Sequence, residues 1–122
     1  METTLNDLPI LDPSPLQDLL KIGAGMELVR ELIDILREDV PTRITLLNKG
    51  LASGDVREVM MEAHQLKGSL GNLGLVRFAE LARLIEEQAR AGNLEGVPGW
   101  LAAIPTAFEE GIQALDQAFP AS

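Results

Sequence analysis

The sequence predicts an all-α protein, built as an antiparallel up-down four-helix bundle with a short additional N-terminal helix. Apolar residues recur at helical spacing in successive stretches that glycines and prolines separate. No stretch shows the alternation of apolar and polar residues that predicts a strand. The chain has 122 residues, which suits one domain with one hydrophobic core, and its short connections favour antiparallel neighbours.

Residues 1–13 are expected to form an irregular N-terminal arm, and residues 14–122 to form the helical bundle domain. The arm contains Pro9 and Pro13 and shows little periodicity. Because proline has no backbone N–H to donate, this composition favours a loop over a regular element.

A short helix is expected at about residues 15–22, directly after the arm. Ser14 is expected to be its N-cap and Pro15 its first helical residue. Serine can accept a hydrogen bond from the first turn, and proline needs no intrahelical donor at that position. The Gly-Ala-Gly segment at residues 23–25 then ends the helix.

The next helical stretch carries four apolar residues that are expected to face the core: Leu28, Leu32, Ile35 and Leu36. Pro41 should kink this helix or begin a new one, because an interior proline removes a hydrogen bond and clashes with the preceding turn. The pattern continues to Gly54, and Asp55 is a natural N-cap for the following helix.

Three further helices are expected after residue 55. The first has a stripe of seven apolar residues: Val56, Val59, Met60, Ala63, Leu66, Leu70 and Leu73. The second, which ends at residues 92–93, has a stripe of six: Leu75, Phe78, Leu81, Ala82, Ile85 and Ala89. The last helix covers about residues 98–119, where Pro105 should produce a kink near Ala102.

Composition argues against several classes of function. The formal net charge of −9 opposes binding to nucleic acid or to anionic membrane surfaces. No segment has the pattern of a signal peptide or a membrane span. With no cysteine and a single histidine, no metal site is expected, and no cofactor either. We expect a cytoplasmic monomer.

The single histidine, His64, is the main candidate for chemistry. Lys67 and Gly68 follow it at three and four positions, spacings that place the three side by side on a helix. On a helical projection, His64 lies roughly 120° from the centre of the apolar stripe, so its imidazole should be exposed.

Gly68 and Gly71 lie on the same exposed strip as His64. A glycine inside a helix costs roughly 1 kcal/mol relative to alanine, so these two call for a reason. Clearance for a phosphoryl group on His64 and for its acceptor is the natural one, and the Lys67 ammonium can offset charge on the phosphoryl oxygens. Taken singly, each residue is more simply a surface residue. Taken together, they favour a phosphoryl site.

These residues resemble the histidine-containing phosphotransfer (HPt) domains of multistep two-component phosphorelays. The resemblance is most specific in residues 63–75, which include His64, Lys67, Gly68 and Ser69. It implies that His64 accepts a phosphoryl group from the aspartyl phosphate of one response-regulator receiver domain and passes it to the aspartate of another. It also implies that the receiver supplies Mg²⁺, and it makes a hybrid histidine kinase a further candidate partner.

Position 86 departs from many members of this family, which have glutamine where this chain has Glu86. The similar domain of chemotaxis kinases has a glutamate that hydrogen-bonds the histidine. We therefore predict that Glu86 accepts a hydrogen bond from the Nδ1 side of His64 and leaves Nε2 free to attack. A surface ion pair is the alternative for Glu86, and Glu87 or Gln88 can fill the role if the helical register differs.

The chain is predicted to carry a phosphoryl group rather than to act alone as an enzyme. The Lys67-Gly68-Ser69 order is not the Gly-Lys-Ser of a P-loop, and no strand precedes it. Two alternatives stay open. The chain could be a non-catalytic helical adaptor in which His64 is incidental, or an enzyme with a phosphohistidine intermediate. The absence of a second histidine disfavours the enzyme.

Overall fold

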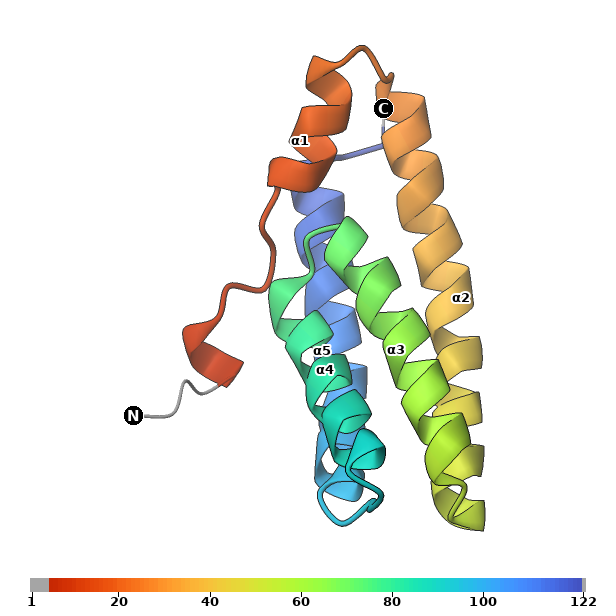
Figure 1. Ribbon diagram of the computed structural model, residues 1–122. Coiled ribbons are helices and arrows are strands. Elements are labelled where there is room, and N and C mark those ends of the chain that lie inside the picture. Colours follow the sequence, from red (N-terminus) through yellow and green to blue (C-terminus); the bar gives the residue numbers. More distant parts are fainter. Residues whose placement is uncertain (1–4, 122) are drawn as a thin grey trace.

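The computed structural model describes residues 5–121, and in this range it consists of helices and loops with no strand (Figure 1). Residues 1–4 of the predicted arm, and residue 122, lie outside the described residues. The elements are η1 (Leu5–Asp7), a 3₁₀ turn, and five α-helices, α1 (Ser14–Lys21), α2 (Met26–Ser53), α3 (Val56–Asn72), α4 (Val76–Arg90) and α5 (Val97–Ala118). The all-α class and the approximate place of each helix are as the sequence predicts.

The four long helices lie side by side, and consecutive ones run in opposite directions (Figure 1). α2 and α4 each contact both α3 and α5, so every long helix touches two others. Their inner faces meet in one core, to which α2 to α5 contribute Ile33, Leu66, Phe78 and Ile104, each at most 1% exposed. Burial of a side chain of this size stabilises the fold by roughly 1.5–3 kcal/mol.

The start of α1 differs from the predicted one by a residue. Ser14 is the first helical residue and not the N-cap, which is Pro13. The carboxylate of Asp12 accepts a hydrogen bond from the Ser14 amide at 3.0 Å, so a side chain nearer the N-terminus satisfies this free donor. Prolines fit at this end because they have no N–H to leave unpaired.

The arm is held against the turn between α3 and α4. The Asp12 amide donates to the carbonyl of Gly74 at 2.7 Å, and the Arg77 guanidinium donates to the carbonyl of Leu8 at 2.7 and 3.0 Å. A Cβ on Gly74 would lie 1.9 Å from the Asp12 carbonyl oxygen, and the φ of Gly74 is +79°. Glycine is therefore required at the point where the arm crosses this turn.

α2 continues without a break through Pro41, so no new helix begins there. Val40 and Leu47 are fully buried on either side of this proline. Their packing keeps the helix together where the backbone loses one hydrogen bond. α5 likewise continues through Pro105, and the bend expected near Ala102 stays a prediction.

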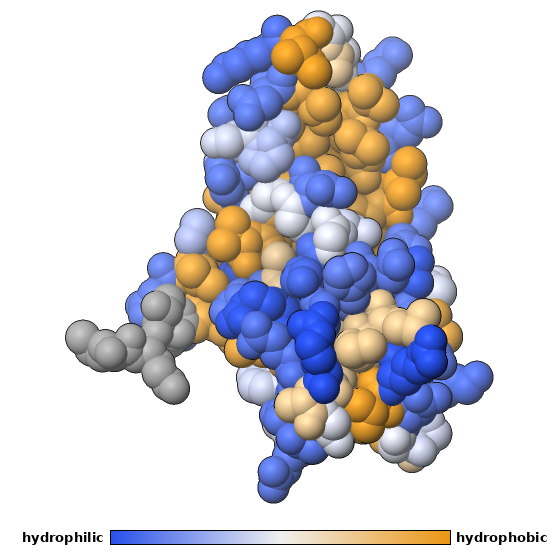
Figure 2. All heavy atoms as spheres, viewed as in Figure 1, coloured by the Kyte–Doolittle hydropathy of each residue, from blue (hydrophilic) through white to orange (hydrophobic). Residues whose placement is uncertain are grey.

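The core face of α2 matches the predicted one only in part: Leu36 is 4% exposed, and Leu32 packs against the core. Leu28 and Ile35, which were expected to be buried, are 44% and 57% exposed. The buried apolar residues of α2 are Val29, Ile33, Leu36, Val40 and Leu47. The helix is apolar on two adjacent faces, and contact with α3 and α5 decides which one is covered. Apolar surface remains at the end of the molecule that holds α1 and the first half of α2 (Figure 2).

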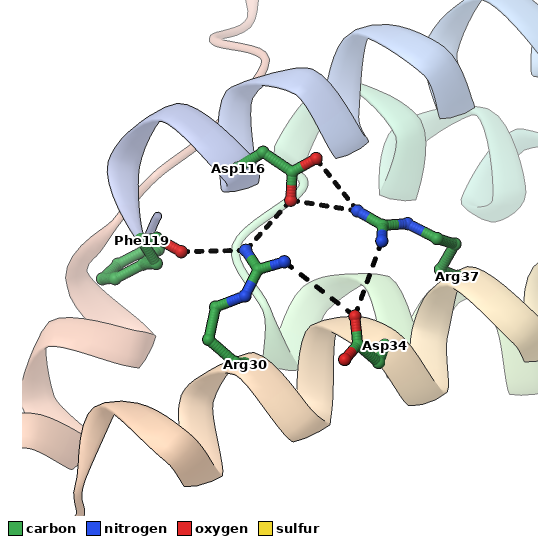
Figure 3. Close-up of polar contacts among 5 residues, drawn as sticks. All are labelled: Arg30, Asp34, Arg37, Asp116 and Phe119. Atoms are coloured by element: carbon green, nitrogen blue, oxygen red, sulfur yellow. Dashed lines mark hydrogen bonds and ion pairs between the residues drawn. The ribbon is translucent and has the colours of Figure 1, made fainter. Parts of the chain in front are cut away.

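A cluster of four charged residues ties the end of α5 to α2 (Figure 3). Arg30 donates to Asp116 at 2.9 Å and to the carbonyl of Phe119 at 2.8 Å, and Arg37 donates to both carboxylate oxygens of Asp116. Asp34 pairs with both arginines. Arg30 thereby satisfies a carbonyl beyond the last turn of α5, where the helix itself offers no donor.

Candidate functional site

His64 lies in the middle of α3 on its exposed side. Ala63 and Leu66 are in the core, whereas the His64 side chain is 61% exposed. The helical period determines this difference, because residues on opposite sides of one turn face the core and the solvent. The imidazole is therefore open to an approaching molecule.

Glu86 of α4 holds the imidazole by one nitrogen. His64 Nδ1 lies 2.9 Å from Glu86 Oε2, which is the contact that the sequence analysis predicts. An ionised carboxylate can only accept hydrogen bonds, so Nδ1 carries the proton and donates it. In the part of the chain that the structure describes, Nε2 has no hydrogen-bond partner, and its lone pair is available as a nucleophile.

The Glu86 side chain is 2% exposed, although the three groups around it reach the surface. Lys67 Nζ lies 2.6 Å from Oε1, and Arg90 donates to the same Oε2 that His64 uses. Burial raises the pKa of Glu86, but hydrogen bonds from Lys67, His64 and Arg90 outweigh it and lower the pKa to about 2. The carboxylate is thus ionised at neutral pH and surrounded by donors.

Arg90 is the member of this cluster that the sequence analysis missed. It lies four residues after Glu86 on the same helix, a spacing that brings two side chains together. The four-residue spacing between Glu86 and Arg90 was the feature of the sequence from which this contact could have been predicted. The Lys67 ammonium, which is expected to offset charge on a phosphoryl group, is paired with Glu86 in this structure.

Gly68 and Gly71 have open space around them. A Cβ built on either would meet no atom within 4 Å, leaving aside the local backbone of the helix. Packing within the chain therefore does not require glycine at these positions. The two glycines are explained either by contact with another molecule or by the backbone flexibility that glycine gives to the helix.

Two grooves border the site. The first, of about 340 Å³, is lined by six residues: Met60, Met61, His64, Gln65, Glu86 and Arg90. The second, of about 490 Å³, has Lys67 and Gly71 in its wall together with Leu8 from the arm. His64 and Lys67 thus line different grooves.

Residues 5–121 contain no group of three or more His, Cys, Asp or Glu side chains placed to hold a metal ion. In the same range, no helix is long and apolar enough to cross a membrane.

Comparisons with known proteins agree with one another. The model of the Hpt domain family matches residues 31–118. The aerobic respiration control sensor protein ArcB of Escherichia coli K12 is 21% identical over 106 residues, which are 87% of this chain and 14% of that protein. The ArcB of Shigella flexneri matches over the same share. The chain therefore spans only a small part of the length of these curated relatives.

A solved structure with a similar fold is that of histidine-containing phosphotransfer protein B (HptB) from Pseudomonas aeruginosa PAO1. The TM-score is 0.82, the sequences are 27% identical, and the match covers 91% of this chain and 95% of the other. The likeness extends over nearly all of both chains.

Proposed function

Because the chain belongs to the Hpt domain family, whose role is histidine phosphotransfer in two-component systems, we propose that His64 carries the phosphoryl group on Nε2. The observation that supports this most directly is the pairing of Nδ1 with a buried carboxylate on an otherwise exposed imidazole. This pairing selects the tautomer whose free lone pair points away from Glu86. His64 is also the only histidine in the chain.

The proposed reaction is a transfer between two carboxylates by way of the imidazole. Nε2 attacks the phosphorus of an aspartyl phosphate on a receiver domain, the P–O bond breaks, and the aspartate leaves as a carboxylate. The ring keeps its Nδ1 proton and becomes positively charged, and the ionised Glu86 balances that charge. A carboxylate of a second receiver then attacks the phosphorus, and the P–N bond breaks.

The partners in this proposal are response-regulator receiver domains, with a hybrid histidine kinase as a further candidate. The receiver supplies Mg²⁺, and this chain supplies an aligned nucleophile, so it acts as a carrier and not as an enzyme on its own. We also propose that α2 to α5 form an up-down four-helix bundle, to which α1 is an addition. The contacts of each long helix with two others support this.

The test is transfer from a receiver phosphorylated with ³²P. We expect label on this chain that is labile in acid and stable in base, and that is absent from His64→Gln. A receiver whose acceptor aspartate is changed to asparagine is the control and should transfer no label. Receivers that bind the chain but never transfer the phosphoryl group would contradict the proposal and favour a helical adaptor.

A further inference from the structure

The N-terminal arm forms one wall of the second groove beside the site. Leu8 of the arm lines this space of about 490 Å³ together with Lys67 and Gly71 of α3 and with Val76 and Ala79 of α4. Leu8, Val76 and Ala79 are each half-buried, so part of their apolar surface stays open. A side chain of another protein that enters the groove would bury apolar surface against both the arm and the bundle.

Leu8 is fixed in place by hydrogen bonds from α4. The Arg77 guanidinium donates to the carbonyl of Leu8 at 2.7 and 3.0 Å and to that of Asn6 at 3.3 Å. The Arg77 amide donates to the carbonyl of Pro9 at 3.1 Å. These contacts hold the arm beside α4 (Figure 1), so the groove has a fixed wall.

The groove is continuous with the exposed strip that carries His64. Lys67 and Gly71 lie on that strip and also line the groove. Gly71 follows His64 by seven residues, which is about 10 Å along a helix. A specific protein interface covers about 800 Å² of each partner and is therefore roughly 30 Å across. A receiver domain centred on His64 thus reaches the groove.

Two observations point to a partner at this place. Leaving aside the local backbone of the helix, a Cβ on Gly71 would meet no atom within 4 Å, so packing within the chain does not require this glycine, whereas a partner in the groove gains room from it. The arm also lies outside residues 31–118, which match the Hpt domain family. It is therefore an element beside the domain that the family shares.

We propose that the arm is part of the surface on which a receiver domain docks, and that the groove walled by Leu8 accepts an apolar side chain of the receiver. This inference rests on the proposed function of His64 as the phosphoryl carrier. Leu8 acts by contact with the partner and takes no part in the chemistry at Nε2. Its loss therefore weakens docking and leaves the reactivity of the imidazole unaltered.

Two phosphoryl donors separate docking from chemistry. A ³²P-labelled receiver must dock, whereas phosphoramidate is a small donor: Nε2 attacks its phosphorus, the P–N bond breaks, and ammonia is released. For Leu8→Ala we expect the second-order rate constant for transfer from the receiver to fall about tenfold, as loss of an apolar contact implies, and the rate at saturating receiver to approach that of the wild type. Phosphorylation by phosphoramidate should proceed at the wild-type rate.

Leu5→Ala is the matched control. Leu5 lies in the same arm and packs against the core, but it does not line the groove. Its substitution should leave transfer from the receiver unchanged. Wild-type transfer in Leu8→Ala, equal slowing in both variants, or slowing with phosphoramidate as well would overturn the proposal.

Release of the arm provides a second test. Arg77→Gln removes the donors that hold the Leu8 carbonyl, and it should slow transfer from the receiver by a similar factor. Once the arm is released, Leu8 no longer walls the groove, so Leu8→Ala should add little in the double variant. Effects of the two substitutions that simply multiply would contradict the proposal.

Binding of an unphosphorylated receiver gives a readout that does not depend on transfer. In ¹³C spectra of the unaltered chain, the receiver should shift the methyl resonances of Leu8 and leave those of Leu5 in place. If no receiver transferred a phosphoryl group, the proposed function would fail, while shifts at Leu8 would still support the docking surface. Transfer without a shift at Leu8 would overturn the role of the arm and leave the proposed function standing.

Discussion

At the scale of single residues, the chemistry of the site depends on the surroundings of Glu86. A buried charge is destabilising unless donors compensate it, and here three side chains do so. One of them is the imidazole, so the group that satisfies the buried carboxylate is also the proposed nucleophile. The hydrogen bond both orients the ring and selects its tautomer.

Replacement of Glu86 tests this coupling. Glu86→Ala removes the acceptor at Nδ1, and we expect transfer from a phosphorylated receiver to be about 10–100-fold slower, the effect of losing a charge-assisted hydrogen bond. Rapid-quench measurement of label transfer gives the rate. Glu87→Ala is the control, because Glu87 is exposed and pairs with Arg83. A wild-type rate in Glu86→Ala would show that Glu86 does not orient the His64 imidazole for transfer.

At the scale of elements, α3 combines a well-packed inner face with an outer face that lacks side chains at two positions. Val59, Ala63 and Leu70 are completely buried, while the exposed strip beside His64 has glycine at two positions. The Asp55 side chain accepts a hydrogen bond from the Glu58 amide at 3.0 Å and so caps the start of the helix. The cap and the core contacts compensate for the low helix propensity of the glycines.

A larger side chain at position 68 should separate stability from transfer. Gly68→Gln should raise the free energy of unfolding by roughly 0.5–1 kcal/mol, because glutamine is a better helix former and the site is open. The same side chain should obstruct a docking receiver and slow transfer about tenfold or more, which corresponds to roughly 1.4 kcal/mol. Urea unfolding and label transfer measure the two effects.

Gly99 provides the comparison for this prediction. It lies in α5, also has no atom within 4 Å of an added Cβ, and is exposed. Gly99→Gln should leave transfer unchanged. If transfer slowed equally in both variants, or in neither, the clearance role of Gly68 would be wrong.

At the scale of the whole molecule, long-range polar contacts hold the two ends of the described chain. Arg77 and Gly74 hold the arm, and Arg30 holds the carbonyl that follows α5. Glu86 links α3 to α4 in the same way. These contacts join segments far apart in sequence, so their loss should lower the free energy of unfolding of the whole fold.

Acid should weaken the fold through Glu86. The pKa of Glu86 is lowered in the folded state to about 2, below its ordinary value of 4.5, so its stabilising contribution is present above about pH 4.5 and is lost as the pH falls toward 2. Over this range the wild type should lose more stability than Glu86→Gln, which cannot titrate. Urea unfolding of both proteins at several pH values measures the difference. A gap between them that does not change with pH would contradict the prediction.

The amino-acid sequence alone was enough to predict the class of fold, the place of each helix and the exposure of His64. These features depend on a local period and on glycine and proline signals, which the chain contains in full. Lys67 and Gly68 follow from spacing on one helix. The contact of Glu86 with His64 Nδ1 was predicted from the family resemblance, because no local sequence rule predicts which residues of two different helices meet.

Tertiary structure alone decided the remaining features. It decided which apolar residues of α2 are buried, placed Leu28 and Ile35 at the surface, and brought Lys67 and Arg90 to the two oxygens of one carboxylate. It also fixed the arm across the turn after α3. Each of these outcomes depends on contacts between distant segments, where packing and charge compensation choose among arrangements that local propensity leaves nearly equal.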